Sequence, residues 1–173
     1  LGLTPGQMYL YNMTNAGQVA TTTSTIIDDN VWNNIVIVFN TGNIVQFYKN
    51  GSLSSTITSL TSFNATWDTI ATRRYPGGSN NPLNGQLSNF SIFDTALTST
   101  QVETLYNNGT PEASISHSPI SWWKLDNTTT GLIDNGSASN NGTNNGATES
   151  AGFVNTLAGE SSNMDSSNLI VDN

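Results

Sequence analysis

The sequence lacks cysteine altogether and has few charged side chains. Among its 173 residues there is no Cys, which excludes disulfide staples, thiol nucleophiles and thiolate metal sites. Only 9% of the residues are charged, whereas a typical soluble protein has roughly 25%. The chain also has no run of about 18 apolar residues and no signal-peptide pattern, so we expect no segment that inserts into a membrane.

The few charges that are present are mostly negative. Twelve Asp and Glu residues stand against four Lys and Arg residues, which gives a formal net charge of −8. Such a surface repels the phosphates of nucleic acids and of anionic membranes, and it attracts cations such as Ca²⁺. Nucleic acids are therefore not expected among the partners of this chain.

Asn, Ser and Thr take the place of the missing charged residues. These side chains favour turns and strand surfaces, and they compete with the backbone in helix interiors. The clearest strand pattern is VWNNIVIVFNTGNIVQFYKNGSLSSTI at residues 31–57, which contains Asn50-Gly51. Asn-Gly is a preferred pair for a type I′ hairpin turn, because both central residues need positive φ. Composition and hairpin together predict an all-β fold.

One short helix is expected near residues 98–107. Thr98 followed by Gln101 matches a capping box, and Gly109 suits the position just after a helix end. The apolar residues of the segment fall on one stripe, so we expect the helix to pack against a sheet.

Two stretches resemble a known family. WNNIVIVFNTGNIVQFYKNGSL contains a Trp, an apolar strand, a short turn and an aromatic strand that ends in Asn-Gly. LNGQLSNFSIFDTALTSTQVETLYNNG contains a Gly, an aromatic strand and an Ala-Leu-Thr turn into a short helix. Over residues 7–109 the chain thus resembles laminin-G-like, concanavalin-A-like domains. The resemblance implies an antiparallel jelly-roll sandwich with one short helix.

The chain is expected to hold three parts. Residues 1–109 resemble the C-terminal part of one jelly roll, and residues 110–120 are predicted to be a linker because Pro111 and Pro119 disfavour helix before them. Residues 121–173 begin with SWWKLDNTTTGLIDNGSASNNGTNNGATES, which resembles the opening of a second jelly roll. This last part could belong to a longer tandem-repeat protein, could fold back to complete the first domain, or could be a strand-donating tail for a neighbouring chain. The first explanation is favoured.

Sugar binding would use exposed aromatic rings, which stack on pyranose faces, and amides, which hydrogen-bond to hydroxyls. The candidate sugar-binding residues lie around the turn-rich loop RYPGGSNNP, and they are Trp67, Arg74, Tyr75, Asn80 and Asn81. For Trp32, Trp122 and Trp123, packing in the core is the favoured interpretation.

Calcium is the cofactor that the resemblance implies, because family domains often bind it at the sandwich rim through Asp and Asn oxygens. The candidate ligands are Asp126, Asp134 and Asn135, with Asp28, Asp29 and Asn30 as a second group. Ser88 and Asn89 stand where the family commonly has an acidic residue, which weakens the case for calcium. The alternative is that Asp28 and Asp134 cap turns.

A catalytic set is not apparent. Glycosidases need two carboxylates, about 5 to 5.5 Å apart in retaining enzymes, but no strand pattern here alternates Glu and Asp. His117 is the only histidine, and it lies in the Pro-flanked linker. We therefore expect no enzymatic activity, and a glycoside hydrolase would require a carboxylate pair beyond this sequence.

These features predict a non-enzymatic structural or adhesive module that packs with neighbouring subunits and binds cell-surface glycans. Its Asn-, Ser- and Thr-rich, Lys-poor style is similar to that of structural proteins of marine bacteriophages and of bacterial adhesins. This similarity implies a location on a virion surface, or an extracellular, cell-surface one. The alternative is a calcium-dependent carbohydrate-binding module of a larger secreted protein.

Overall fold

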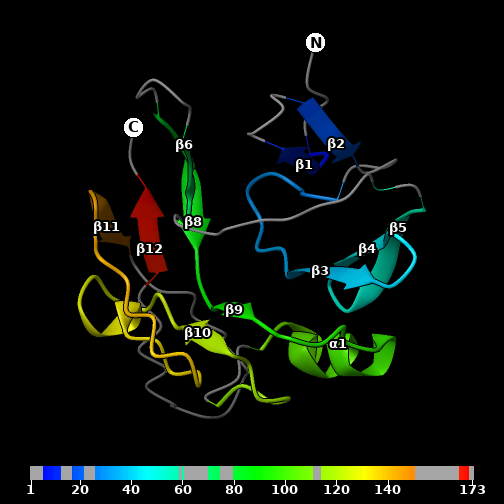
Figure 1. The fold of residues 1–173 in the computed structure, drawn as a ribbon. Helices are drawn as coiled ribbons and strands as arrows, with labels where there is room; N and C mark the ends of the chain where they lie inside the picture. The colour runs from blue at the N-terminus through cyan, green and yellow to red at the C-terminus, as the bar shows by residue number, and fades with distance from the viewer. Residues whose placement is uncertain are drawn as a thin grey trace. The chain divides into compact units, whose positions relative to one another are not determined.

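The computed structural model contains two compact units, and each is built from two separate pieces of chain (Figure 1). Unit 1 comprises Leu1–Thr66 and Thr95–Ser116, and unit 2 comprises Trp67–Asp94 and His117–Asn173. The residues that the structure describes are 6–12, 17–21, 26–58, 60, 70–74, 80–110, 114–150 and 168–171. The sequence predicts a different division, by family repeat, into residues 1–109, 110–120 and 121–173. The two units are defined by contacts and do not test that division, so it stays a prediction.

The described residues of unit 1 form two antiparallel sheets. The first pairs β1 (Tyr9–Asn12) with β2 (Gly17–Thr21), and the second has the order β3 (Ile35–Asn40), β4 (Ile44–Lys49), β5 (Ser52–Ile57). Asn50 and Gly51 join β4 to β5 with φ angles of 49° and 77°. Positive φ at both positions is what a type I′ turn requires, so the predicted hairpin is confirmed.

One face of the three-stranded sheet forms the core of unit 1. Val45 and Phe47 alternate on β4 and are fully buried, and they pack with Leu10, Ile26 and Leu60. Successive side chains of a strand point to opposite faces, so this alternation places both on the same side of the sheet. The core thus joins the sheet to chain segments that precede it, at Leu10 and Ile26, and that follow it, at Leu60.

Helix α1 (Ser99–Tyr106) lies in unit 1, where the sequence predicts it. Thr98 Oγ1 accepts the N–H of Gln101 at 3.3 Å, and Gln101 Oε1 accepts the N–H of Thr98 at 2.8 Å. These two bonds satisfy N–H groups that the first helical turn leaves without partners. Asn107 ends the helix in a left-handed conformation, and the short 3₁₀ helix η1 (Asn107–Gly109) follows. The predicted capping box is confirmed.

Unit 2 is made of short strands. They are β6 (Thr72–Arg74), β7 (Asn80–Pro82), β8 (Gly85–Leu87), β9 (Phe90–Ile92), β10 (Ser121–Trp123), β11 (Ala147–Ser150) and β12 (Asn168–Val171), with the 3₁₀ helix η2 (Thr130–Leu132) between β10 and β11. The pairings among the described strands are antiparallel: β6 with β7, β9 with β10, and β12 between β11 and β8. Strands from before and after helix α1 therefore share sheets.

The core of unit 2 centres on Trp123 and Leu125, which are both buried. Trp123 lies against Phe90 with ring centroids 5.9 Å apart. Trp122 is buried as well, its indole N–H donates to Asn89 Oδ1 at 3.2 Å, and the Lys124 ammonium lies over its ring. The predicted core packing of these two tryptophans is confirmed.

Antiparallel strands with one short α-helix in the described part of the chain agree with the all-β class. The closed jelly-roll sandwich stays a prediction, because the described strands form separate small sheets. In the same residues, no helix has the length and apolar character needed to cross a bilayer.

Candidate functional site

The predicted sugar-binding loop falls partly outside the described residues. Trp67 and Tyr75 lie there, while Arg74 ends β6 and both Asn80 and Asn81 belong to β7. Backbone pairing sets Arg74 opposite Asn80. The structure thus brings three of the five candidates together in one hairpin, and their role in sugar binding stays a prediction.

Asp134, a predicted calcium ligand, has both carboxylate oxygens engaged by the protein. Oδ1 accepts the backbone N–H groups of Trp122 at 2.7 Å and Gly136 at 2.8 Å, and Oδ2 accepts that of Asn140 at 2.8 Å. Burial raises the pKa of Asp134, but these N–H groups and the Ser121 hydroxyl lower it further, so the pKa lies below its usual value. Asp134 therefore stays charged and ties its loop to strand β10.

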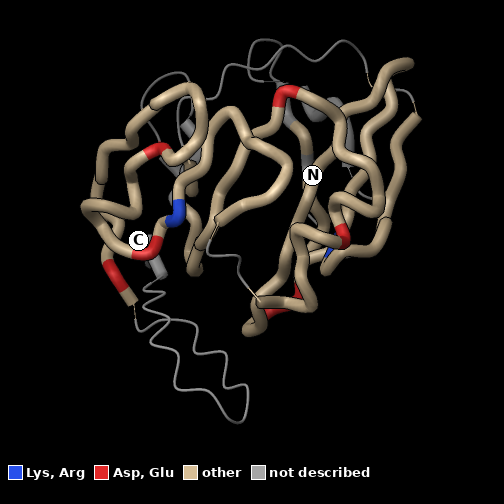
Figure 2. Tube along the Cα trace, turned by 90° about the horizontal axis from the view of Figure 1, so that it is seen from below, with Lys and Arg blue, Asp and Glu red and all other residues tan. Residues whose placement is uncertain are grey.

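The other two predicted calcium ligands also make protein contacts. The Asn135 amide donates to the carbonyls of Ile133 at 2.9 Å and Trp122 at 3.3 Å, and Asp126 Oδ1 accepts from the Asn127 amide at 3.2 Å. Acidic residues are scattered along the described trace (Figure 2). Among the described residues, no three His, Cys, Asp or Glu side chains group closely enough to hold a metal ion. This geometry favours the turn-cap interpretation of Asp134, and calcium binding stays a prediction.

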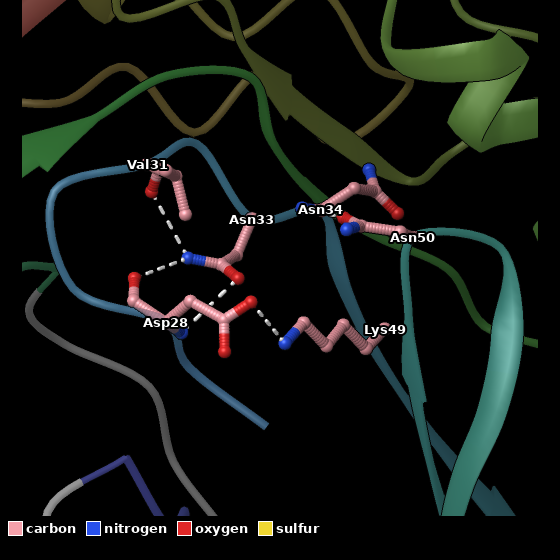
Figure 3. Close-up of polar contacts among 6 residues, drawn as sticks. All are labelled: Asp28, Val31, Asn33, Asn34, Lys49 and Asn50. Carbon is pink, nitrogen blue, oxygen red and sulfur yellow. Dashed lines mark hydrogen bonds and ion pairs between the residues drawn. The ribbon is translucent and has the colours of Figure 1, made fainter. Parts of the chain in front are cut away.

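A different surface element, residues 28–34 of unit 1, has the features of a binding site. We call it the pinned loop (Figure 3). The Asn33 amide donates to the carbonyls of Asp28 at 2.9 Å and Val31 at 3.0 Å, and Asn33 Oδ1 accepts the N–H of Asp28 at 3.2 Å. Asn30 has a φ of 61°, which lets the chain reverse inside the loop. A single side chain thus closes the loop on itself.

Both ends of the pinned loop are fastened to the β4–β5 hairpin (Figure 3). Asp28 Oδ2 lies 2.6 Å from the Lys49 ammonium. At the other end, the N–H of Asn34 donates to Asn50 Oδ1 at 2.9 Å, and the N–H of Asn50 donates to the Asn34 carbonyl at 2.8 Å. A partly exposed ion pair contributes at most about 1 kcal/mol, so these contacts serve mainly to fix the position of the loop.

The pinned loop presents apolar side chains to solvent. Val31 is 60% exposed and Trp32 is 38% exposed, beside the exposed Asp29 and Asn30. The prediction that Trp32 packs in the core is wrong. Trp32 precedes strand β3, which begins at Ile35, so the alternation that buries strand residues does not extend to it. In the sequence, Trp32 is followed by two Asn residues before the apolar strand begins, and this was the available indication that Trp32 lies outside the strand.

The chemistry of the pinned loop suits a ligand that has both an apolar face and hydroxyl groups. The indole ring of Trp32 offers a flat apolar contact, while Asp29 and Asn30 belong to residue types that hydrogen-bond to hydroxyls. Because the backbone of the pinned loop is already held in place, little conformational entropy is lost when a ligand binds to it.

Comparisons with known proteins give one family match. Residues 2–103, more than half of the chain, match a laminin-G family model described as "Concanavalin A-like lectin/glucanases superfamily". The chain is also similar to the crystal structure of an S-layer domain-containing protein (residues 221–444) from Clostridium thermocellum, with 24% identity and a TM-score of 0.41. That match covers 52% of this chain and 46% of the other, so this chain spans less than half of that structure. No curated protein matches this chain.

Proposed function

This chain belongs to the concanavalin A-like lectin/glucanases superfamily, and from that premise we propose that it is a non-enzymatic adhesive module that binds glycans through the pinned loop. The family predicted from the sequence is thereby confirmed, and the function is the proposal. The module works outside the cell, on a cell or virion surface, next to neighbouring subunits.

The observation that carries this proposal is the exposure of Trp32 on a loop that is fixed in place. An aromatic ring in solvent gains free energy when a ligand covers it, and exposed apolar groups beside polar ones mark interaction sites. Three hydrogen bonds from Asn33 and the tie from Asp28 to Lys49 hold the backbone around the ring. Trp32 therefore meets a ligand without first ordering its loop.

The charge of the chain favours a neutral glycan. With a formal net charge of −8 and an exposed carboxylate at Asp29, the protein repels sialylated, sulfated or otherwise anionic sugars. Neutral pyranoses have an apolar face that stacks on indole. Their hydroxyls can donate hydrogen bonds to the carboxylate of Asp and can both donate to and accept from the amide of Asn.

The calcium-dependent alternative has weaker support. Asp134 uses both oxygens for backbone N–H groups, and Asn135 uses its amide for two carbonyls. A calcium ion would have to share the Asp134 oxygens with these three backbone N–H groups. Asp28, Asp29 and Asn30, the second group of candidate calcium ligands, belong to the pinned loop, whose backbone is held by the Asn33 hydrogen bonds and the Asp28–Lys49 ion pair.

The test is a glycan array with the full chain, followed by titration calorimetry on the best ligand. Trp32→Ala should weaken binding about fivefold to tenfold or more, which is the loss of roughly 1 kcal/mol or more expected for a stacked aromatic anchor. Phe39→Ala removes a ring of similar exposure, 39%, outside the pinned loop, and should leave affinity unchanged. Equal binding by the Trp32→Ala variant and the wild type would refute the role of the loop.

Two further results decide the details of the proposal. Asn33→Ala removes the three hydrogen bonds that close the loop, so it should weaken binding while the fold, followed by circular dichroism, persists. Binding that disappears in EDTA and returns with Ca²⁺ would instead support the calcium-dependent module. A wild-type chain that binds neither neutral nor anionic glycans would overturn the glycan part altogether.

A further inference from the structure

The two pieces of unit 2 share a single core. Ile70, Leu87, Phe90 and Ile92 come from the piece before helix α1, and Trp123, Leu125, Leu132 and Ala147 come from the piece after it. Each piece alone would leave its apolar side chains in water. Unit 2 therefore exists only when the two pieces dock.

The seam between the pieces consists of two strand pairings, β10 with β9 and β12 with β8. β10 runs antiparallel to β9, with Ser121 opposite Ile92 and Trp123 opposite Phe90. Backbone hydrogen bonds flank the pairing on both sides, from the Asn89 N–H to the Lys124 carbonyl and from the Ile120 N–H to the Ile92 carbonyl, each at 2.9 Å. All of these contacts are noncovalent and local to the seam.

The piece after the seam, residues 117–150, holds itself together, and we call it the docking segment. Asp134 accepts three of its backbone N–H groups. The N–H of Asn135 donates to the Trp122 carbonyl at 2.7 Å, and the N–H of Gly142 donates to the Leu132 carbonyl at 2.8 Å. Since these bonds lie within the segment, they persist when the segment leaves its own β9.

The joint at the start of the docking segment is strained. His117 and Ser118 have φ angles of 65° and 49°, and Pro119 follows directly. Residues other than glycine pay a steric penalty in this left-handed region, and a residue before proline normally adopts extended backbone. Straightening the joint releases this strain, and short strained joints favour the exchange of an element between copies of a protein.

We propose that the docking segment exchanges between copies of this chain together with β12, which pairs with its β11, so that β10 and β12 of one copy pair with β9 and β8 of another. The seam contacts are the same in either arrangement, because none depends on which copy supplies the segment. Reciprocal exchange gives a dimer, and one-way exchange gives a row of copies. An exchanged assembly would display several pinned loops at once and would raise avidity for a repetitive surface.

The absence of cysteine allows a direct test with full-length chains. One copy carries Ile92→Cys, and a second copy, with a different tag, carries Ser121→Cys. Opposed residues of an antiparallel pair have Cα atoms about 4.5 to 5.5 Å apart, within the range of about 4.4 to 6.8 Å that a disulfide spans. Neither copy can form this disulfide alone, so a disulfide-linked heterodimer after mixing and oxidation requires exchange.

Two controls make either outcome decisive. A single chain with both substitutions should form the intrachain disulfide, which shows that the seam geometry is right. A mixture of Ser121→Cys with Ser52→Cys, an exposed β5 position of unit 1 that is not part of either seam pairing, should give only background heterodimer. An intrachain disulfide in the double variant without heterodimer above that background would overturn the proposal.

A second measurement does not depend on cysteine. Light scattering over a concentration series should show the wild type forming dimers or larger species. Changing both His117 and Ser118 to Gly relieves the strained joint of the closed form, and it should lower the dimer fraction by about tenfold. A wild type that stays monomeric at every concentration, or a double-Gly variant that dimerises equally well, would argue against exchange.

Discussion

Replacing Asp134 with Ala should strongly destabilise unit 2. The side chain is 7% exposed, and its loss leaves the N–H groups of Trp122, Gly136 and Asn140 without this hydrogen-bond acceptor. An unsatisfied buried donor costs about 1 to 3 kcal/mol, and some of the three will reach water, so we expect a loss of roughly 3 to 5 kcal/mol. A typical domain has only about 5 to 15 kcal/mol in total.

Two matched variants test whether the hydrogen bonds are the cause. Asp134→Asn keeps one oxygen, which can accept from Trp122 and Gly136, but places an NH₂ group toward the Asn140 N–H. It should therefore cost about 1 to 3 kcal/mol. Asp126→Asn changes a carboxylate of the same segment that accepts one side-chain hydrogen bond, and it should cost at most about 0.5 kcal/mol.

Hydrogen exchange followed by mass spectrometry is the assay, because it reports on residues 117–150 separately from unit 1. Protection in this segment should fall in the order wild type, Asp126→Asn, Asp134→Asn, Asp134→Ala, with the first two nearly equal. Protection in Asp134→Ala equal to that of the wild type would refute the reasoning. A loss in Asp126→Asn as large as in Asp134→Asn would show that charge, rather than the accepted N–H groups, is responsible.

The same carboxylate predicts a dependence on pH. Because folding lowers the pKa of Asp134, its contribution to stability is fully present above the unfolded value of about 3.9 and is lost as pH falls through the lower folded value. Urea unfolding of the wild type should therefore weaken below about pH 4 more steeply than that of Asp134→Asn, which has no proton to bind. Parallel pH profiles would contradict this prediction.

Two other substitutions have clear expected outcomes. In Gly136→Ala the new Cβ would lie 2.5 Å from the Ile120 carbonyl oxygen, so thermal unfolding should show a loss of about 1 to 3 kcal/mol, whereas Gly142→Ala, whose nearest neighbour atom is 3.5 Å away, should be nearly neutral. Thr98→Ala breaks the capping box with Gln101 and should cost about 0.5 to 2 kcal/mol in urea unfolding; an unchanged midpoint would show that the cap contributes nothing.

Several features of the fold could be predicted because they depend on neighbours along the chain. The Asn50-Gly51 turn requires two residues with positive φ, and the start of helix α1 requires Thr98 and Gln101 three positions apart. Such requirements involve residues only a few positions apart, so a short stretch of sequence is enough to predict them. The all-β class follows from the same kind of evidence, repeated along the chain.

The candidate site could not be predicted in the same way. Trp32 has the sequence of a strand opening, whereas in the structure it is 38% exposed on a loop whose ends are tied to Lys49 and Asn50 of a later hairpin. The sequence left Asp134 open between a calcium ligand and a turn cap, and its hydrogen bond from the N–H of Trp122 depends on the tertiary structure.

The sequence by itself thus determined the strand-rich class, the hairpin, the helix cap and the family of this chain. The tertiary structure alone decided that β9 pairs with β10 and that unit 2 draws its core from two pieces of chain separated by helix α1. The physical reason is that burial and strand pairing depend on which distant segments come into contact. Apolar strands of similar length can form backbone hydrogen bonds with one another in several pairings, so the sequence of each strand does not identify its partner.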